Sequence, residues 1–161
     1  MKRLSVLGST GSVGEQTLDV ASLHPDAFDV VALAAGKSIA RLAEQVKRFR
    51  PQLVSVGSED GARELRERVG TELDIRAGAP GLEAVATHPA DLVMAALVGA
   101  VGLAPARAAI RAGRDVALAN KEVMVMAGAL VRREVSARGT SLLPVDSEHS
   151  AIFQALSGQR V

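Results

Sequence analysis

The chain has 161 residues, enough for one domain with a substantial core, and 48% of them are hydrophobic, which excludes a disordered protein. A formal net charge of +1 provides no basic surface, so neither nucleic acid nor an anionic membrane is expected as a partner. Cysteine is absent, which excludes disulfides and thiolate metal ligands and is compatible with the cytoplasm. The first predicted strand begins so close to Met1 that no signal peptide is expected, and no apolar run could span a bilayer.

The first predicted elements are a buried strand over Leu4–Leu7, a glycine-rich turn over Gly8–Gly14 and a helix that ends at Leu23. One face of this helix is expected to be apolar: Val13, Thr17, Val20 and Ala21. A strand, a glycine-rich turn and a helix form the context of a dinucleotide-binding loop, where glycine lets the backbone approach a pyrophosphate. The spacing is G-x-x-G-x-x-G, whereas G-x-G-x-x-G is usual, so a simple turn between packed elements is the alternative.

Apolar runs and amphipathic helices alternate along the rest of the chain. The further predicted strands are Phe28–Ala35, Leu53–Val56, Leu73–Ala77, Asp91–Ala96, Asp115–Ala119 and Thr140–Val145. The further predicted helices are 39–49, 59–69, 81–86, 103–112, 121–138 and 147–156, with Ser38 and Ser58 as N-caps of the first two. Continuous apolar strands are typical of a parallel sheet buried on both faces. The pattern predicts an α/β fold, a doubly wound, mostly parallel, Rossmann-like sheet with helices on both faces.

Ligands of such sheets bind beyond the carboxyl ends of the strands, so polar residues at those ends are candidate site residues. Gly36, Lys37 and Ser38 follow the second strand, where enzymes that use NAD usually carry Asp or Glu for the ribose diol. A cation and a hydroxyl suit a 2′-phosphate better, so these residues favour NADPH. The alternative is a surface lysine beside a helix cap.

Asn120, Lys121 and Glu122 form a polar triplet after a later strand. The triplet is a candidate for cofactor and substrate contacts, because lysine is a compact charge able to meet a hydroxyl or a phosphate oxygen. The alternative is the chemistry of a helix start, with Asn120 as N-cap and Glu122 favoured by the helix dipole. The two interpretations are compatible.

Asp146, Ser147 and Glu148 follow the last strand. Two carboxylates two residues apart can point into one cleft, and hard oxygen ligands select Mg²⁺ or Mn²⁺. The alternative is an Asp or Ser cap followed by Glu in the first turn, which the residues alone favour. The neighbouring His149 is interpreted as a hydrogen-bonded helix residue more readily than as a ligand or an acid.

Several segments together resemble the amino-terminal part of the 1-deoxy-D-xylulose 5-phosphate reductoisomerases. They are residues 7–14 with 17–20, 31–37, 94–100, 117–122 and 143–154. The resemblance covers essentially the whole chain. The segments Ala-Asn-Lys-Glu and Pro-Val-Asp-Ser-Glu-His are far more specific than the glycine loop.

The resemblance implies conversion of 1-deoxy-D-xylulose 5-phosphate to 2-C-methyl-D-erythritol 4-phosphate on the non-mevalonate route to isoprenoids. A metal-assisted rearrangement of the carbon skeleton would be followed by reduction with NADPH. The implied metal is Mn²⁺ or Mg²⁺, with Co²⁺ as a further option. The substrate would be a phosphorylated sugar, and the full-length protein a homodimer in the bacterial cytoplasm.

The resemblance also implies a role for each matching residue. Thr10, Gly11, Ser12 and Val13 would line the pyrophosphate, and Gly36, Lys37 and Ser38 would meet the adenosine end. Asn120 and Glu122 would contact the cofactor, whereas Lys121 would be a catalytic residue that binds the substrate. Asp146 and Glu148 would hold the metal, and Ser147 and Glu148 would bind the substrate. The family often has Asn where Ser38 stands, which softens the expected preference for a 2′-phosphate.

Members of that family are roughly two to three times as long as this chain, more than one such domain holds. We therefore expect residues 1–145 to form a Rossmann-like NADPH-binding domain and residues 146–161 to begin a metal and substrate domain. The chain alone is expected to bind NADPH without turnover. Two alternatives are a non-catalytic nucleotide-binding module and another NADP-dependent reductase of this fold. The segment Asp146–Glu148 would have no role in such a reductase.

Overall fold

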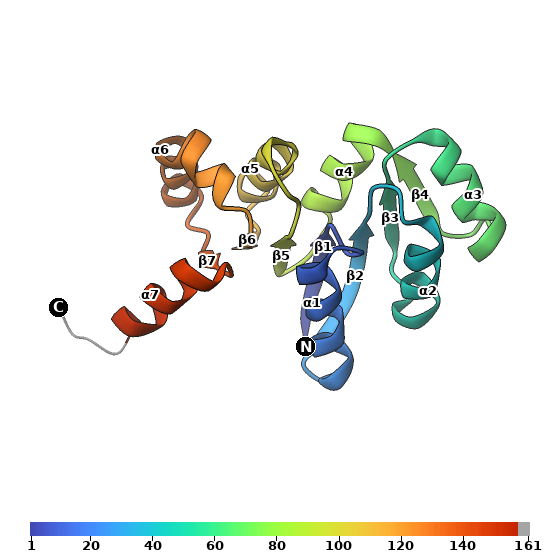
Figure 1. Ribbon diagram of the computed structural model, residues 1–161, viewed down its shortest axis with the longest axis horizontal. Coiled ribbons are helices and arrows are strands. Elements are labelled where there is room, and N and C mark those ends of the chain that lie inside the picture. Colours follow the sequence, from blue (N-terminus) through green and yellow to red (C-terminus); the bar gives the residue numbers. More distant parts are fainter. Residues whose placement is uncertain (158–161) are drawn as a thin grey trace.

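The computed structural model describes residues 1–157, and the strands of this part form one seven-stranded sheet (Figure 1). The strands are β1 (Lys2–Leu7), β2 (Phe28–Ala34), β3 (Leu53–Val56), β4 (Asp74–Ala77), β5 (Leu92–Ala95), β6 (Asp115–Leu118) and β7 (Leu142–Pro144). Their order across the sheet is β4-β3-β2-β1-β5-β6-β7, and every neighbouring pair is parallel. The predicted doubly wound α/β fold is confirmed.

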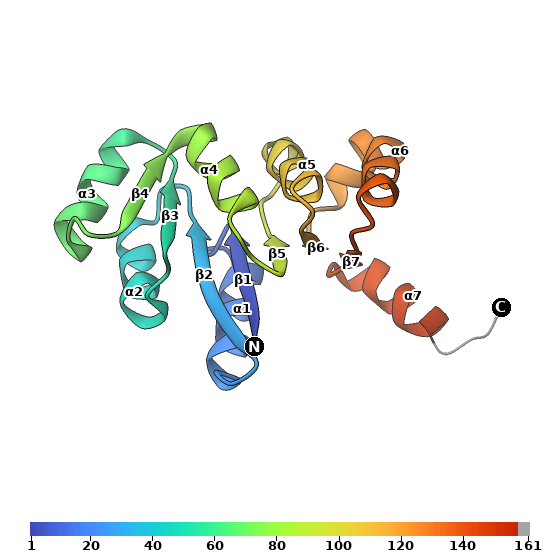
Figure 2. The ribbon, with the colours of Figure 1, turned by 180° about the vertical axis from the view of Figure 1, so that it is seen from behind.

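Helices cover both faces of this sheet, as Figures 1 and 2 show from opposite sides. They are α1 (Ser12–Leu23), α2 (Ile39–Phe49), α3 (Glu59–Val69), α4 (Gly78–Thr87), α5 (Leu103–Arg111), α6 (Lys121–Arg138) and α7 (Ser147–Ser157), with a 3₁₀ turn, η1, at Ala100–Gly102. Helices α1, α2 and α3 pack on one face, and α4, α5 and α6 pack on the other. None of the helices in residues 1–157 has the length and apolar character that crossing a membrane requires.

The core consists of two aliphatic clusters, one on each face of the sheet. Alternate strand residues contribute to different clusters: Leu4 and Val6 of β1 pack under α1 and α2, whereas Leu7 packs under the opposite helices. Because both faces are covered, both sets of side chains are mainly apolar, with Ser5 and Ser55 as buried exceptions, which explains the nearly continuous apolar runs in the sequence.

The chain order changes direction at β1. From β1 the strands run outward through β2 and β3 to β4, and the chain then returns to place β5 on the other side of β1. At such a switch point the loops after the two central strands diverge and leave a crevice at the carboxyl edge. The loop after β1 begins at Gly8 and the loop after β5 begins at Ala96, so both candidate ligand loops flank this crevice.

The buried face of α1 differs from the prediction. Its buried residues are Gly14, Leu18 and Ala21, whereas the side chain of Val20 is 51% exposed. The helix packs through Gly14 against the backbone of the preceding loop. This close approach fixes the rotation of the helix about its axis, which a count of apolar side chains does not reveal.

Two features mark the end of the described chain. Helix α6 has a non-helical residue, Ala127 (φ −145°, ψ 25°), which separates its first turns from the rest. Helix α7 projects away from the sheet in Figures 1 and 2 and has no buried residue. Its exposed apolar side chains are Ile152, Phe153 and Leu156.

Candidate functional site

The glycine loop after β1 uses its three glycines for different purposes. Gly8 has φ +82°, and a Cβ there would lie 2.6 Å from the carbonyl oxygen of Ala96 across the switch point. A Cβ on Gly14 would overlap the carbonyl oxygen of Gly8 and lie 2.7 Å from Cα of Ser9. Gly11, in contrast, is exposed and stands at the N-cap of α1. The first and third glycines are therefore required by the packing of the protein itself.

The amino-terminal end of α1 has the character of an anion site. Gly11 has no side chain with which to cap the helix, and no described side chain caps it. The first N–H groups of a helix lack intrahelical partners and carry the positive end of the helix dipole. The first turn of α1 can therefore donate several hydrogen bonds to one phosphate group.

Asn120 fixes the loop on the other side of the switch point. Its side chain is buried, and its amide donates hydrogen bonds to the carbonyl oxygens of Leu97 (2.6 Å) and Gly99 (2.8 Å). Its Oδ1 accepts a hydrogen bond from the backbone N–H of Val123 and so caps α6. The helix-start interpretation of Asn120 is confirmed. Both side-chain amide hydrogens of Asn120 are used in these two hydrogen bonds, so any contact that Asn120 makes with a cofactor involves its other atoms.

A cleft of about 390 Å³ joins the candidate segments. Three helices begin at its wall, α1 with Gly11–Val13, α6 with Asn120–Glu122 and α7 with Asp146–Glu148, and the rest of the lining is the loop Ala96–Val98 and Ala119. Helix starts carry partial positive charge and favour a negatively charged group, whereas the carboxylates of Glu122, Asp146 and Glu148 in the same lining favour a cation. Nine candidate residues meet here, whereas Thr10, Gly36, Lys37 and Ser38 do not line this cleft.

Asp146 is held in place by His149. Its Oδ1 accepts hydrogen bonds from the backbone N–H of His149 (2.9 Å) and from Nδ1 of the same residue (2.7 Å). The backbone hydrogen bond lowers the pKa of Asp146 most, and the bond from the ring lowers it further. Asp146 therefore caps α7 through Oδ1, as the alternative interpretation holds. Its Oδ2 accepts no hydrogen bond from the residues that the structure describes.

Glu148 and Lys121 share the electrostatic environment of this carboxylate. The pKa of Glu148 is lowered chiefly by the hydrogen bond from its own backbone N–H and then by the Ser147 hydroxyl, which donates to Oε2 at 2.9 Å. The charge of Asp146 opposes this shift, and the charge of Lys121 lowers the pKa of both carboxyl groups. The two carboxylates are thus ionised at neutral pH and lie close enough to interact with one another and with one ammonium group.

The two carboxylates fit the chemistry of a hard divalent cation, though only as part of its ligand set. Within residues 1–157 no group of three or more His, Cys, Asp or Glu side chains could surround a metal ion. Mg²⁺ usually keeps several waters and binds through one or two carboxylates together with oxygens of its substrate. Asp146 and Glu148 meet that requirement, because both are ionised and line one cleft.

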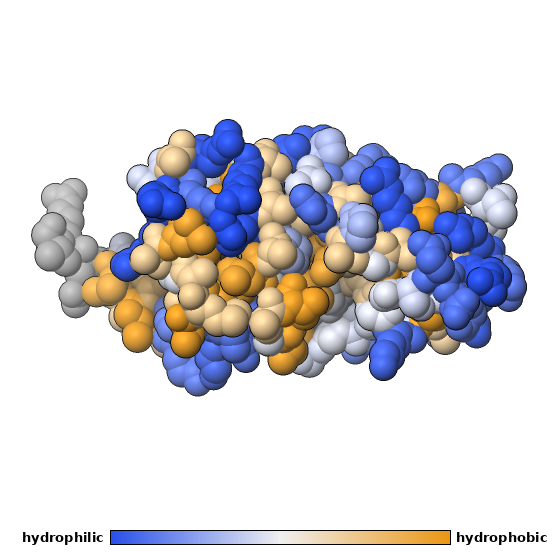
Figure 3. Space-filling view, turned by 90° about the horizontal axis from the view of Figure 1, so that it is seen from above, coloured by the Kyte–Doolittle hydropathy of each residue, from blue (hydrophilic) through white to orange (hydrophobic). Residues whose placement is uncertain are grey.

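The residues after β2 border a second, apolar cavity of about 520 Å³. Its lining includes Gly36 and, from distant segments, Ala79, Leu97 and Val101. Figure 3 shows hydrophobic surface over the middle of the molecule and toward α7, whereas the end with α2 and α3 is mostly polar. Leu97 also lines the first cleft, so the two cavities adjoin at the switch point.

Lys37 and Ser38 are exposed beside this apolar cavity. Ser38 stands at the predicted N-cap position of α2, but its side chain makes no capping hydrogen bond. Its backbone (φ −81°, ψ 64°) lies outside the extended conformation of a typical N-cap. The hydroxyl is therefore not occupied by the helix. At Ser58, where the backbone is extended, the predicted cap forms with the N–H of Gly61.

The sequence interpretation missed a buried amide that touches the glycine loop. Nε2 of Gln45, in the middle of α2, donates a hydrogen bond of 2.9 Å to the carbonyl oxygen of Ser9. The available signal was a polar residue between Leu42 and Val46 on the apolar stripe of that helix.

Both the sequence and the fold of the chain match known proteins. Residues 4–128 match the family model described as 1-deoxy-D-xylulose 5-phosphate reductoisomerase. The 1-deoxy-D-xylulose 5-phosphate reductoisomerase of Symbiobacterium thermophilum is 55% identical over 163 residues, which cover 98% of this chain and 42% of the relative. The chain thus spans about 42% of the length of this curated relative.

Two solved structures have the same fold over nearly the whole chain. The 1-deoxy-D-xylulose 5-phosphate reductoisomerase of Zymomonas mobilis in complex with NADPH superposes with a TM-score of 0.91 at 43% identity, over 95% of this chain and 41% of that one. A DOX-P reductoisomerase in complex with NADPH, fosmidomycin and magnesium gives a TM-score of 0.91 at 36% identity, over 99% and 41% of the two chains.

Proposed function

The chain belongs to the 1-deoxy-D-xylulose 5-phosphate reductoisomerase family, and we propose that it forms the NADPH-binding part of an enzyme that makes 2-C-methyl-D-erythritol 4-phosphate from 1-deoxy-D-xylulose 5-phosphate. The observation that carries this proposal is the cleft at which α1, α6 and α7 all begin. An uncapped helix start, an ammonium group and two ionised carboxylates line it together. These are the groups that a dinucleotide, a phosphorylated sugar and a divalent cation require.

NADPH is assigned to the carboxyl edge of the sheet. Residues 10–13 would hold the pyrophosphate, because the first turn of α1 offers N–H groups that no described side chain caps. Gly36, Lys37 and Ser38 would meet the adenosine end, with the ammonium and the hydroxyl at the 2′-phosphate. The apolar cavity beside Gly36 provides a surface for a flat, weakly polar ring. Asn120 and Glu122 would contact the cofactor at the start of α6.

The reacting end is assigned to the residues after β6 and β7. Asp146 and Glu148 would hold Mn²⁺, Mg²⁺ or Co²⁺, and Ser147 and Glu148 would contact the substrate. Lys121 would act as the catalytic residue, placing its ammonium against a substrate oxygen. When bound, the metal would polarise the substrate carbonyl and the cofactor would supply the hydride. The hydrogen bonds from His149 keep Asp146 ionised and hold its Oδ1, which leaves Oδ2 to face a cation.

The same proposal divides the chain. Residues 1–145 would form the cofactor domain, and residues 146–161 would begin a metal and substrate domain, of which residues 158–161 lie outside the described part. A homodimer of the whole enzyme and a cytoplasmic location rest on the resemblance to the family alone. The 161-residue chain is expected to bind NADPH without turnover, so oxidation of NADPH by this chain in the presence of substrate would contradict that expectation.

Calorimetric titration with NADPH and NADH, each with and without Mn²⁺, tests the proposal. Heat is the suitable signal because the chain has no Trp or Tyr. We expect NADPH to bind about tenfold more tightly than NADH, a difference of about 1.4 kcal/mol. Lys37→Met should reduce this ratio to near one, whereas Lys47→Met, a matched change on the exposed side of α2, should preserve it. A folded chain that binds neither nucleotide would refute the assignment.

A further inference from the structure

Gln45 occupies a position where the fold would ordinarily place an apolar residue. It lies on the buried stripe of α2 with Leu42 and Val46, and its side chain is only 6% exposed. The packing of α2 on the sheet requires no amide there. A polar side chain at such a place is retained for its hydrogen bonds.

The hydrogen bond of Gln45 reaches the glycine loop across 36 positions of the sequence. Nε2 of Gln45 donates to the carbonyl oxygen of Ser9, which is itself fully buried, and the backbone N–H of Ser9 donates to the carbonyl oxygen of Ala34 at 2.9 Å. The main chain of Ser9 is therefore held by β2 at its nitrogen and by α2 at its oxygen.

This tie determines the direction of the next N–H group. The carbonyl of Ser9 and the N–H of Thr10 belong to one planar trans peptide, so the two bonds point in opposite directions. With the oxygen held toward Gln45, the Thr10 N–H points away from α2. This N–H makes no hydrogen bond to any residue that the structure describes. It is the first donor of the segment that continues into the start of α1.

Stability alone does not account for the amide. The second polar atom of Gln45, Oε1, is buried without a partner among the described residues. An apolar side chain of similar volume would remove this unpaired acceptor and would leave the Ser9 oxygen unpaired in its place. Loss of the unpaired Oε1 raises the free energy of unfolding, and loss of the partner of the Ser9 oxygen lowers it. Each concerns one buried acceptor, so the two effects largely offset each other.

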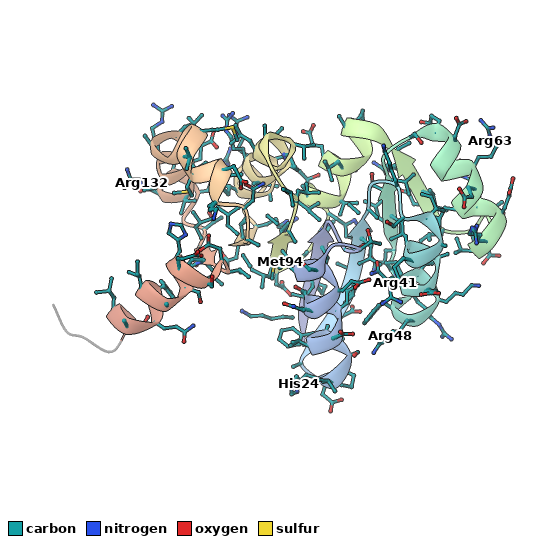
Figure 4. The ribbon with its side chains drawn as sticks, in the orientation of Figure 1. His24, Arg41, Arg48, Arg63, Met94 and Arg132 are labelled. Atoms are coloured by element: carbon teal, nitrogen blue, oxygen red, sulfur yellow. The ribbon has the colours of Figure 1, made fainter. Side chains whose placement is uncertain are left out.

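The other links between α1 and α2 are at the surface. Arg41 bonds to Glu15 at 2.7 Å, and Arg48 lies 3.7 Å from Asp19 and donates to the Ser22 hydroxyl, each with an exposed guanidinium (Figure 4). Such exposed pairs contribute little and are screened by salt. They join side chains of the two helices and do not contact the backbone of the loop, so they cannot orient its peptides.

We infer that Gln45 is a positioning residue for dinucleotide binding, which holds the Ser9 carbonyl so that the Thr10 N–H and the start of α1 face the cofactor. The inference rests on the proposed function, because it assigns the pyrophosphate to this loop. Gln45 acts through the loop and does not touch the ligand.

The test compares Gln45→Met with Gln16→Met, the same substitution on an exposed residue of α1. NADPH affinity is measured by calorimetry and stability by thermal unfolding followed by circular dichroism. Gln45→Met should weaken NADPH binding about tenfold or more, while its Tm stays within about 3 °C of the wild type. Gln16→Met should change neither. Equal NADPH affinity in the two variants, or a loss of affinity that merely follows a large fall in Tm, would overturn the inference.

Hydrogen exchange in the free protein separates this inference from the proposed function. Gln45→Met should accelerate exchange in the segment Gly8–Gly14, and Gln16→Met should not. Gln45→Leu also removes the donor and introduces no charge, so it should resemble Gln45→Met in both readouts. If the wild type binds no dinucleotide, the proposed function fails, and the assignment of Gln45 to dinucleotide binding fails with it. If the wild type binds and both Gln45 variants bind and exchange as it does, only the role of Gln45 fails.

Discussion

The three glycines of the loop after β1 allow a graded test of the structure. Gly11, Gly14 and Gly8 can each be replaced by alanine, which adds one methyl group at three places in one turn. The methyl at Gly11 would lie 3.4 Å from the Gly8 carbonyl oxygen, which is an ordinary contact, and the backbone there is extended. The methyl at Gly14 would overlap that same oxygen. A search for glycines in the sequence gives the three positions equal weight, whereas the structure ranks them.

The expected losses follow from these contacts. Gly11→Ala should cost about 1 kcal/mol or less, because alanine is a poorer N-cap residue than glycine but the extended backbone accommodates its methyl group. Gly14→Ala forces backbone against backbone, and overpacking of this kind costs about 3 kcal/mol. For a domain of this size that loss corresponds to a fall in Tm of about 6 to 12 °C. Gly8→Ala combines a close contact of 2.6 Å with φ +82°, which alone costs about 1 to 2 kcal/mol.

Urea and thermal unfolding, followed by far-UV circular dichroism, measure these losses. Gly11→Ala is the matched control, because it places the same methyl group in the same turn. Equal Tm values for Gly11→Ala and Gly14→Ala would refute the packing described for the start of α1. A stable Gly14→Ala protein would also remove the explanation for the rotation of that helix.

Two further predictions concern α5 and α6. Glu134 accepts hydrogen bonds from Arg107 and Arg111, and chiefly the bonds from Arg107 lower its pKa from 4.5 to about 2. The folded pKa of Glu134 lies below the unfolded value, so its stabilising effect is complete above about pH 4.5 and is lost as the pH falls toward 2. Glu134→Gln should therefore lower the free energy of unfolding in urea by about 1 to 2 kcal/mol at pH 7 and by almost nothing at pH 2. Asn120→Ala should cost about 2 to 4 kcal/mol, since it removes a helix cap and two buried hydrogen bonds. Asn120→Asp keeps the cap oxygen but not the donors, and full stability of that variant in urea would show that the bonds to Leu97 and Gly99 are unimportant.

Local chemistry made most of the fold predictable from the sequence. The bounds of α2, α3, β3 and α6 agree with the prediction, and Ser58 and Asn120 cap α3 and α6 through hydrogen bonds that act within one turn of the chain. The parallel pairing of the strands and the covering of both sheet faces were predicted from the alternation of elements and the continuous apolar runs, whereas the order of the strands came from the structure.

The parts that escaped prediction depend on contacts between distant residues. The orientation of α1 follows from Gly14 against the backbone of Gly8, and no pattern of side chains encodes it. The bond from Gln45 to Ser9 joins two elements that appear unrelated in the sequence. At the site, the sequence could not assign Asp146, because a helix cap and a metal ligand both use an aspartate at this position. The hydrogen bond from the His149 N–H shows that Oδ1 caps the helix. The metal role of Asp146 and Glu148 stays a prediction.

The central place of β1 in the sheet has a consequence for how the protein is made. On one side β1 pairs with β2, which follows it closely, and on the other side it pairs with β5, so that Leu4 lies opposite Leu92. During synthesis the strands from β1 to β4 can assemble first, but one edge of β1 keeps its backbone groups unpaired until β5 has left the ribosome. Contacts of such long sequence separation form slowly and leave apolar surface exposed while they are awaited. The loop at Gly8 gains its neighbour Ala96 only at that stage, and the cleft still needs the starts of α6 and α7. The glycine loop near the start of the sequence thus gains its full surroundings only after the chain has been made as far as Glu148.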